Sequence, residues 1–460
     1  MTADAQENVK VYTVNGATAG AGSASSLPDW LTRKRAIKGK GKRAIREEFE
    51  GAINLIQHFE FPEASNRIKV TKNGHHAIAT GVYKPQMRVY DLDQLTLKFE
   101  RHSDAENIDF SVRKSLCCNL FGLNLTIYQI LSDDWTKSIH LQADRTVELH
   151  AQGGLHYKTR IPRFGRALAY HYPSCDALLA GAGGEVFRLN LEQGRFLAPL
   201  SLNTKTEHGD VLGVNAIDIN PAHQLLSFAA EGPGTVEFWD LRSRSRVNVL
   251  ALPRSLALTS TSATVLPGIG APSRIFAATA LSSRSDGLSL AVGTSTGHTL
   301  LYDIRSPKPY ATKDQGYGLP VHRVAWIDGG SRMAGDGFVM SADKKVLKVW
   351  DRESPSSNFA SVNPPTDIND VCHLPGTGLF MLANEGIHMT SYYIPQLGPA
   401  SKWCSFLDNL TEEMEEQTVR NVYEDFKFVE RSELSAYVPS SFVVAYRFAD
   451  LSRLVLVWIT

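Results

Sequence analysis

Cysteine is scarce in this sequence, and its distribution excludes two common kinds of cross-link. The chain has 460 residues but only five cysteines, at positions 117, 118, 175, 372 and 404, and no two of them form a C-x-x-C pair. Small disulfide frameworks and cysteine-based zinc sites need paired cysteines at regular spacing. The pattern therefore argues against both and is typical of a protein in a reducing compartment.

Long apolar runs are also missing. The first ten residues, MTADAQENVK, are polar and lack the apolar stretch of a secretory signal. The most apolar candidate for a membrane span, residues 440–460, contains Arg447, Asp450 and Arg453. Charges at this density are incompatible with a bilayer-spanning helix. We therefore expect neither secretion nor a membrane partner.

An excess of charge of either sign is absent from the chain as a whole. Its 48 Lys and Arg residues balance 48 Asp and Glu residues, for a net charge of zero. A protein that coats nucleic acid along its whole length would be strongly basic. Any electrostatic partner must therefore be recognised by a local patch.

The usual local signatures of catalysis are missing too. The sequence has no H-E-x-x-H, no G-x-S-x-G, no Walker A sequence and no kinase H-R-D. The cluster Gly181–Gly184 precedes a strand pattern, whereas a phosphate loop precedes a helix, so it is interpreted as a turn. His75 and His76 follow Asn73-Gly74, which predicts a hairpin turn rather than a metal site. We predict no catalytic residue, metal, cofactor or small-molecule substrate.

What the sequence does contain is an internal repeat. An apolar segment, a turn and an alternating strand ending in an aromatic residue and Asp recur in Ala79–Asp91, Ala230–Asp240, Ala291–Asp303 and Ser341–Asp351. Weaker copies occupy Ala143–His150, Gly181–Asn190 and Ala383–Tyr393. Seven copies between residues 79 and 395 give a period of about 45 residues, the size of a four-stranded WD40-type blade. The pattern predicts an all-β chain whose residues 51–395 form a seven-bladed WD40-type β-propeller.

Two details of this propeller follow from the strand pattern. Residues 8–14 contain one strand, Val9–Val14, without the rest of a blade, and we expect it to close the ring by pairing within the blade of Ala383–Tyr393. The alternative is a disordered lead-in. Trp239 and Trp350 end repeat strands, where core packing is expected more than ligand stacking.

The linker of residues 15–50 carries the one strong charge anomaly. Eight basic residues and no acid occupy positions 33–46. Such a run can contact RNA phosphates, can serve as a nuclear import signal, or can be a plain solvated surface, and the first two roles are compatible. The candidate contact residues are Arg33, Lys34, Arg35, Lys38, Lys40, Lys42, Arg43 and Arg46.

Three further segments lie outside the repeat. Residues 396–435 mix aromatics with acids and predict a short acidic-aromatic C-terminal extension, in which a short helix precedes an extended arm. Its candidate partner-docking residues are Trp403, Phe406, Leu407, Tyr423, Phe426 and Phe428. Residues 110–129 lengthen one repeat interval by about 20 residues and are interpreted as an insert, and residues 436–460 as a non-native tail.

Several long motifs, in order, carry a specific resemblance. Leu27–Trp30 precedes the basic run, and Tyr157–Arg166, Tyr170–Asp176, Arg188–Arg195, Tyr317–Pro320, Asp367–Cys372, Tyr392–Pro399 and Trp403–Leu410 follow. Together they resemble the nucleolar protein ten family, called essential nuclear protein two in yeast, over about residues 8–435.

The resemblance implies a WD-repeat protein of the nucleus and nucleolus. It would be a component of the small-subunit processome, which assembles on pre-ribosomal RNA for 18S rRNA maturation, and its partners would be other processome proteins and that RNA. The family supplies no catalytic residues. Family members continue into a further extension and a charged tail where this chain turns into Val438–Val444 and stops, and they join the flanks of residues 110–129 directly.

The leading hypothesis is therefore a non-catalytic scaffold in ribosome biogenesis. A rival from another class is a hydrolase or lyase with its site in the central channel, which would show channel-facing histidines and carboxylates. A third is a substrate adaptor of a ubiquitin ligase, which would show a ring of arginines in the blade loops.

Overall fold

The computed structural model describes residues 9, 11–15, 55–111, 134–202, 211–232, 234–253, 277–328, 337–412, 426–429, 444–447 and 454–457. The chain divides into two compact units, Met1–Pro399 and Ala400–Thr460, which are described separately. Among the described residues, no helix has the length and apolar character that a bilayer crossing demands.

The first unit is a ring of seven four-stranded antiparallel sheets, as the repeat predicted. Blades 1 to 3 consist of β2 (Ser65–Val70), β3 (His76–Gly81), β4 (Gln86–Asp91) and β5 (Thr96–His102); β6 (Asn107–Ser111), β7 (Ser138–Gln142), β8 (Thr146–Ala151) and β9 (Gly154–Arg160); and β10 (Gly165–His171), β11 (Asp176–Gly181), β12 (Glu185–Asn190) and β13 (Arg195–Ser201).

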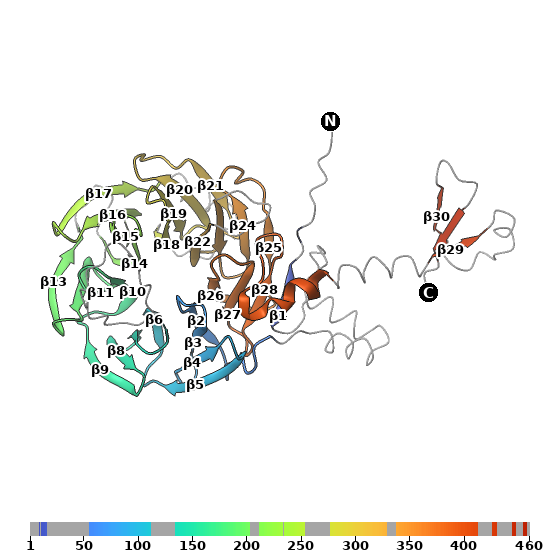
Figure 1. Cartoon of the computed structure of the whole chain (residues 1–460). Helices are drawn as coiled ribbons and strands as arrows, with labels where there is room; N and C mark the ends of the chain where they lie inside the picture. The colour runs from blue at the N-terminus through green and yellow to red at the C-terminus, as the bar shows by residue number, and fades with distance from the viewer. Residues whose placement is uncertain are drawn as a thin grey trace, which may run out of the picture. The chain divides into compact units, whose positions relative to one another are not determined.

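Blades 4 to 7 follow in chain order around the ring (Figure 1). They consist of β14 (Gly213–Ile219), β15 (Leu226–Glu231), β16 (Thr235–Asp240) and β17 (Ser245–Ala251); β18 (Ala278–Ser283), β19 (Ser289–Thr294), β20 (His298–Asp303) and β21 (Ala311–Asp314); β22 (Arg323–Ile327), β23 (Phe338–Ala342), β24 (Leu347–Asp351) and β25 (Ala360–Val362); and β26 (Ile368–His373), β27 (Leu379–Asn384), β28 (Thr390–Tyr393) and β1 (Tyr12–Asn15).

The last blade is closed by the N-terminal strand. β1 pairs antiparallel with β28, with Tyr12 opposite Tyr393 and Thr13 opposite Tyr392. Asn15 fixes the end of this strand, because its side-chain amide donates to the Ile56 carbonyl and accepts from the Ile56 N–H, both at 3.2 Å. The N-terminal strand therefore pairs in the blade that the sequence indicated, but it spans Tyr12–Asn15 rather than the predicted Val9–Val14.

Position within a blade explains which strands are apolar throughout. The second strand of each blade has sheet on both sides and a neighbouring blade on both faces, and every residue of β11 and of β27 is buried. A strand covered in this way has a continuous apolar run rather than alternation. The outermost strand β9 has no such cover and exposes four consecutive residues.

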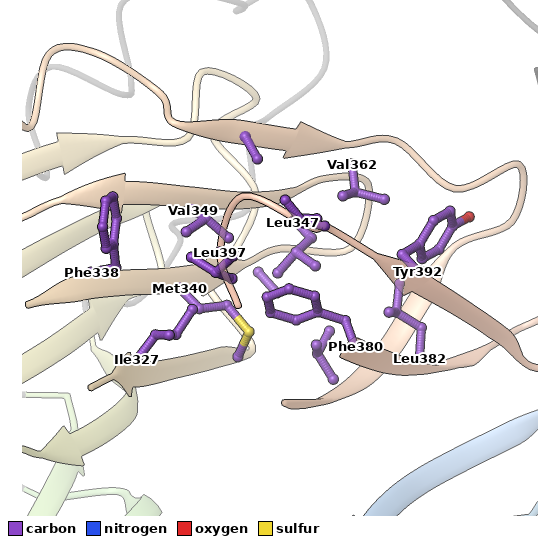
Figure 2. Packing of buried hydrophobic residues seen from close by; sticks show 14 of the residues in the cluster. Ile327, Phe338, Met340, Leu347, Val349, Val362, Phe380, Leu382, Tyr392 and Leu397 are labelled. Atoms are coloured by element: carbon purple, nitrogen blue, oxygen red, sulfur yellow. The ribbon is translucent and has the colours of Figure 1, made fainter. Parts of the chain in front are cut away.

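The core lies between the blades. Figure 2 shows the packing of blades 6 and 7, where Phe380 of β27 lies beside Leu347 and Met340 of β24 and β23. Trp350 is fully buried, and its indole N–H donates to the Ser341 hydroxyl at 3.0 Å. The repeat-terminal tryptophans are thus core residues, since Trp239 is also buried and donates to Glu237 at 3.0 Å.

The predicted insert begins too early. Phe110 and Ser111 belong to β6 and pair with His140 and Ile139 of β7. The Phe110 side chain is fully buried and stacks on the His140 ring with centroids 5.4 Å apart. Assigning these two residues to the insert is wrong, because the short strand needs them to form its ladder and to fill the blade core. Residues 112–129 lie outside the described residues.

The second unit begins with helical turns. A 3-10 helix, η1, spans Lys402–Cys404, and residues 406–412 are α-helical. The Asp408 carboxylate accepts the Ala400 N–H at 3.2 Å. Further along, β29 (Phe426–Val429) and β30 (Val444–Arg447) both pair antiparallel with β31 (Leu454–Val457). The segment expected to be a non-native tail therefore supplies two strands of this sheet.

Candidate interaction surface

Seven strands, one per blade, surround the propeller axis: β2, β6, β10, β14, β18, β22 and β26 (Figure 1). Six of them have a register irregularity near the start, and the residue at this position is Asn66, Ile108, Arg166, Asn215, Thr279 or Asn369. A β-bulge re-aims the side chain that it carries. These positions lie on the face of the propeller where the chain enters the innermost strand of each blade.

The polar side chains at these bulges join neighbouring blades. The amide of Asn66 donates to the Asn107 carbonyl at 2.9 Å, and the hydroxyl of Thr279 donates to the Val321 carbonyl at 2.7 Å. Asn215 and Asn369 make the equivalent bonds to Ala278 and Ser65. Backbone groups that a bulge leaves without a ladder partner are satisfied in this way.

Deeper along the same strands, three carboxylates bond the next blade. Asp109 accepts the Leu168 N–H at 3.1 Å, Asp218 accepts the Ser283 N–H at 2.7 Å, and Asp370 accepts the Ile68 N–H at 3.4 Å. Each bond joins an inner strand to the inner strand that follows it around the ring. The inner carboxylates therefore hold the ring together.

Cations lie beside two of these three carboxylates. The Lys69 ammonium lies 2.6 Å from Asp109, and the Arg67 guanidinium lies 3.7 Å from Asp370. Burial by itself would raise the pKa of Asp109, but Lys69 and Arg67 outweigh it and hold that pKa below its ordinary value. Asp109 is thus held in its ionised, hydrogen-bonded form, whereas a general acid has a raised pKa.

A different arrangement is found between blades 2 and 3. The chain crosses here from the outermost strand β9 to the innermost strand β10 through residues 160–166, Arg-Ile-Pro-Arg-Phe-Gly-Arg. Arg160, Arg163 and Arg166 are exposed, and we call these three the arginine track. Because the crossing segment runs from the rim of the propeller to its axis, the track follows the same line.

The crossing segment is anchored between its arginines. The Ile161 side chain is buried, and its N–H donates to the Arg145 carbonyl at 2.8 Å. A Cβ at Gly165 would lie 2.7 Å from the Leu141 side chain, which is itself fully buried, so a larger residue would force Leu141 to move. The buried residues hold the segment down, and the exposed ones between them project from a fixed backbone.

Phe164 lies between two members of the track. Its side chain is 59% exposed, and the Arg145 guanidinium lies 5.2 Å from its ring centroid. Arg145 also donates to the Pro162 carbonyl at 3.3 Å, which keeps the guanidinium against the ring.

The turn between β11 and β12 supports this surface from below. A Cβ at Gly181 would lie 1.9 Å from the Phe164 carbonyl oxygen, and one at Gly183 would lie 2.1 Å from an Arg163 guanidinium nitrogen. Gly183 also has φ of +92°, a conformation open to glycine. The glycine cluster is therefore a blade turn, as its sequence context predicted, and its lack of side chains lets Phe164 and Arg163 lie over it.

Comparison with known proteins places this chain among relatives. The family described as "Nucleolar protein 10-like, N-terminal domain" matches residues 2–116 and 120–418. The chain belongs to this family. It is 49% identical over 429 residues to the ribosome biogenesis protein enp2 homolog of Schizosaccharomyces pombe, a match that covers 93% of this chain and 61% of that protein.

Two further relatives agree with the family assignment. The chain is 44% identical to the ribosome biogenesis protein ENP2 of Saccharomyces cerevisiae over 93% of this chain and 53% of that protein. It is 42% identical to human nucleolar protein 10 over 94% of this chain and 55% of that protein. The chain thus spans between half and two thirds of the length of these relatives. The family match leaves out residues 117–119, which lie within the predicted insert.

The contact residues predicted for this member of the nucleolar protein 10 family differ in whether they are described and in whether they are exposed. The eight basic residues of positions 33–46, and Tyr423, lie outside the described residues. Phe406 is exposed and Trp403 half-buried, but Leu407 is buried, so its side chain is not available for docking in this structure. Phe426 and Phe428 are both in β29, opposite Val457 and Val455 of β31.

Sequence reasoning did not single out the arginine track. Residues 157–166 served only as a motif of the nucleolar protein 10 family. The sequence signal that could have identified the track was an arginine at every third position, with Phe164 between the second and the third. Its meaning depends on which strands lie at the rim and at the axis, and that is a tertiary property.

Proposed function

We propose that this protein is a non-catalytic WD-repeat scaffold in ribosome biogenesis. It acts in the nucleolus, within the small-subunit processome, and contributes to 18S rRNA maturation. The observation that carries this proposal is the match over 93% of the chain to proteins named for ribosome biogenesis. Pre-ribosomal RNA and other processome proteins are the proposed partners.

The inner carboxylates support a structural rather than a catalytic role. A channel hydrolase would need an acid or base with a pKa near neutrality and a free position beside it. Asp109, Asp218 and Asp370 each accept a backbone N–H from the next blade. These bonds give the three carboxylates a role in joining the blades.

Two segments outside the propeller carry the proposed partner contacts. The basic residues between positions 33 and 46 supply eight positive charges in a chain of zero net charge, which suits contact with RNA phosphates or an import receptor. Trp403, Phe406, Tyr423, Phe426 and Phe428 are proposed to dock processome proteins. Aromatic side chains of this kind dominate protein interfaces.

Affinity purification of the full chain from nucleolar extract tests the scaffold role. The expected result is recovery of 18S precursors and small-subunit assembly proteins, together with accumulation of unprocessed precursor when the protein is depleted. A parallel sample carries the arm variant, in which the eight basic residues between 33 and 46 are replaced by Gln and an independent import signal is attached. The scaffold proposal is overturned if the parent chain recovers no precursor and depletion leaves 18S rRNA unchanged.

A further inference from the structure

We propose that the arginine track, Arg160, Arg163 and Arg166, together with Phe164, binds a single-stranded RNA segment that runs from the rim of the propeller toward its axis. The proposal rests on the proposed function for the source of the RNA. It assigns a contact separate from the basic arm, the eight basic residues between positions 33 and 46. Phosphates lie along the three guanidinium groups, and one base stacks on the Phe164 ring.

The charges of the track are available to a ligand. Among the described residues, no ion pair involves Arg160 or Arg163, and both side chains are exposed. Arg166 is shared, because it donates to the Asn215 amide oxygen at 2.7 Å and pairs with Glu231. Arg160 is near enough to Asp144 to help lower the pKa of that carboxyl, but its side chain, like that of Arg163, is exposed to a ligand. Arg166 is held in place at the axis.

The aromatic ring adds a feature that phosphate binding alone does not need. Phe164 exposes 59% of its side chain, and Arg145 covers part of its ring. Proteins that bind single-stranded nucleic acids combine a positively charged path for the backbone with aromatic rings on which bases stack. An arginine beside the ring adds a cation–π contribution to that stack.

The linear layout favours RNA over an acidic protein segment or a phosphopeptide. A phosphopeptide is held by a cluster of arginines that converge on one group. Here the arginines are three residues apart along a segment, bent at Pro162 and Arg163, that crosses from the rim of the propeller to its axis, so they are spread along the path of the chain. A polymer with a charge at every unit can contact all of them, and the ring between them is placed for a base.

The surface is also preformed. Ile161 and Gly165 pack the backbone of the crossing segment onto blades 2 and 3, and the bare turn of Gly181 and Gly183 supports Phe164 and Arg163. A ligand therefore does not bear the entropy of ordering this backbone on binding. The pairing of Arg166 with Glu231 further fixes the inner end of the track.

The test measures binding of a fluorescently labelled uridine-rich 20-nucleotide RNA to the full chain by anisotropy, across salt concentrations. All proteins carry the arm variant, so that the basic arm does not mask the track. The double variant Arg160→Gln/Arg163→Gln is expected to weaken binding about tenfold and to reduce the slope of log affinity against log salt by about 1.4, for two lost phosphate contacts. Phe164→Ala is expected to weaken binding about tenfold with an unchanged slope.

A matched control is available at the opposite end of the sheets. Arg242 and Arg244 are exposed in the turn between β16 and β17, and Arg242→Gln/Arg244→Gln removes the same charge. This variant is expected to bind like its parent. Urea unfolding of each variant verifies that the propeller is intact, and crosslinking with 4-thiouridine RNA is expected to label the peptide that contains Phe164.

The outcomes separate this proposal from the proposed function. If the track variants and the control bind RNA equally, the track proposal is overturned, whatever the nucleolar purification shows. It is also overturned if the track variants keep full RNA affinity but lose a processome protein from the purification, since the surface then belongs to that protein. If the track binds RNA and the purification contains no pre-ribosomal RNA, the track stands and the proposed function fails.

Discussion

Asp109 provides the sharpest test of how the propeller is held closed. Its carboxylate accepts the Leu168 N–H of the next blade at 3.1 Å and the Phe110 N–H at 2.8 Å, and it pairs with the Lys69 ammonium at 2.6 Å. The carboxylate is 16% exposed, so water screens the pair only in part. Asp109→Asn keeps the shape of the side chain and removes its charge.

The expected loss is about 2–4 kcal/mol in the free energy of unfolding. A hydrogen bond to a charged group contributes about 1.5–3 kcal/mol, and the substitution weakens the one to Leu168. It also leaves the Lys69 ammonium, which lies beside the Phe110 ring, without its counter-ion. Removing one partner of a fully buried ion pair lowers stability by several kcal/mol, and this pair is largely buried. Urea unfolding at neutral pH measures the difference.

The pH dependence gives a second readout. The pKa of Asp109 is held below its ordinary value in the folded protein, chiefly by Lys69 and Arg67 against the opposing effect of burial. A lowered folded pKa adds stability above the unfolded pKa of about 3.9, and that stability is lost as the pH falls through the folded pKa. The gap between the parent and Asp109→Asn is therefore expected to narrow below about pH 4.

Asp104 supplies the control. It pairs with Lys158 at 2.7 Å, nearly the same distance, but its side chain is 83% exposed. Exposed pairs contribute little because water screens them, so Asp104→Asn is expected to leave urea unfolding nearly unchanged. Equal destabilisation by the two substitutions would refute the reasoning that the position of Asp109 between blades gives its charge a structural role.

Three further expectations follow from the described contacts. Phe110→Ala removes a fully buried ring from blade 2 and is expected to lower the free energy of unfolding in urea by about 3–5 kcal/mol. An unaltered unfolding midpoint would show that Phe110 belongs to the insert and not to the blade. Asn15→Ala removes both hydrogen bonds to Ile56 and is expected to lower the free energy of unfolding by about 1–3 kcal/mol. Limited proteolysis should then cut the N-terminal strand first. An unchanged digest would show that β1 does not depend on this side chain. Burial, with His150, holds the pKa of His140 well below its ordinary value, so stability is lost as the pH falls below about 6.5. His140→Phe removes the titrating group and should reduce this loss by at most about 1.4 kcal/mol per pH unit. Unfolding curves between pH 5 and 7 would detect the change.

The repeat could be recognised in the sequence because each blade is formed by residues that are close together in the chain. Ser341–Asp351 contains a buried strand, a turn and an alternating strand within a few residues, and its Trp350 packs against Ser341 only nine residues away. The error at Phe110 arose from the same reliance on spacing. An interval that was too long showed that extra residues were present, but the place where they begin depends on the pairing of β6 with β7.

Sequence alone therefore determined the class of fold, the number of blades and the family, because strand period, turn chemistry and motif order are local properties. Tertiary structure decided what the inner carboxylates and the crossing segment do. Asp109 meets Leu168 across 59 residues, and Asp370 meets Ile68 across 302, so neither bond has a signature in a local window. The arginine track has its direction only because β9 lies at the rim and β10 at the axis. Ring closure creates both relationships, since it brings together strands that are distant in the chain.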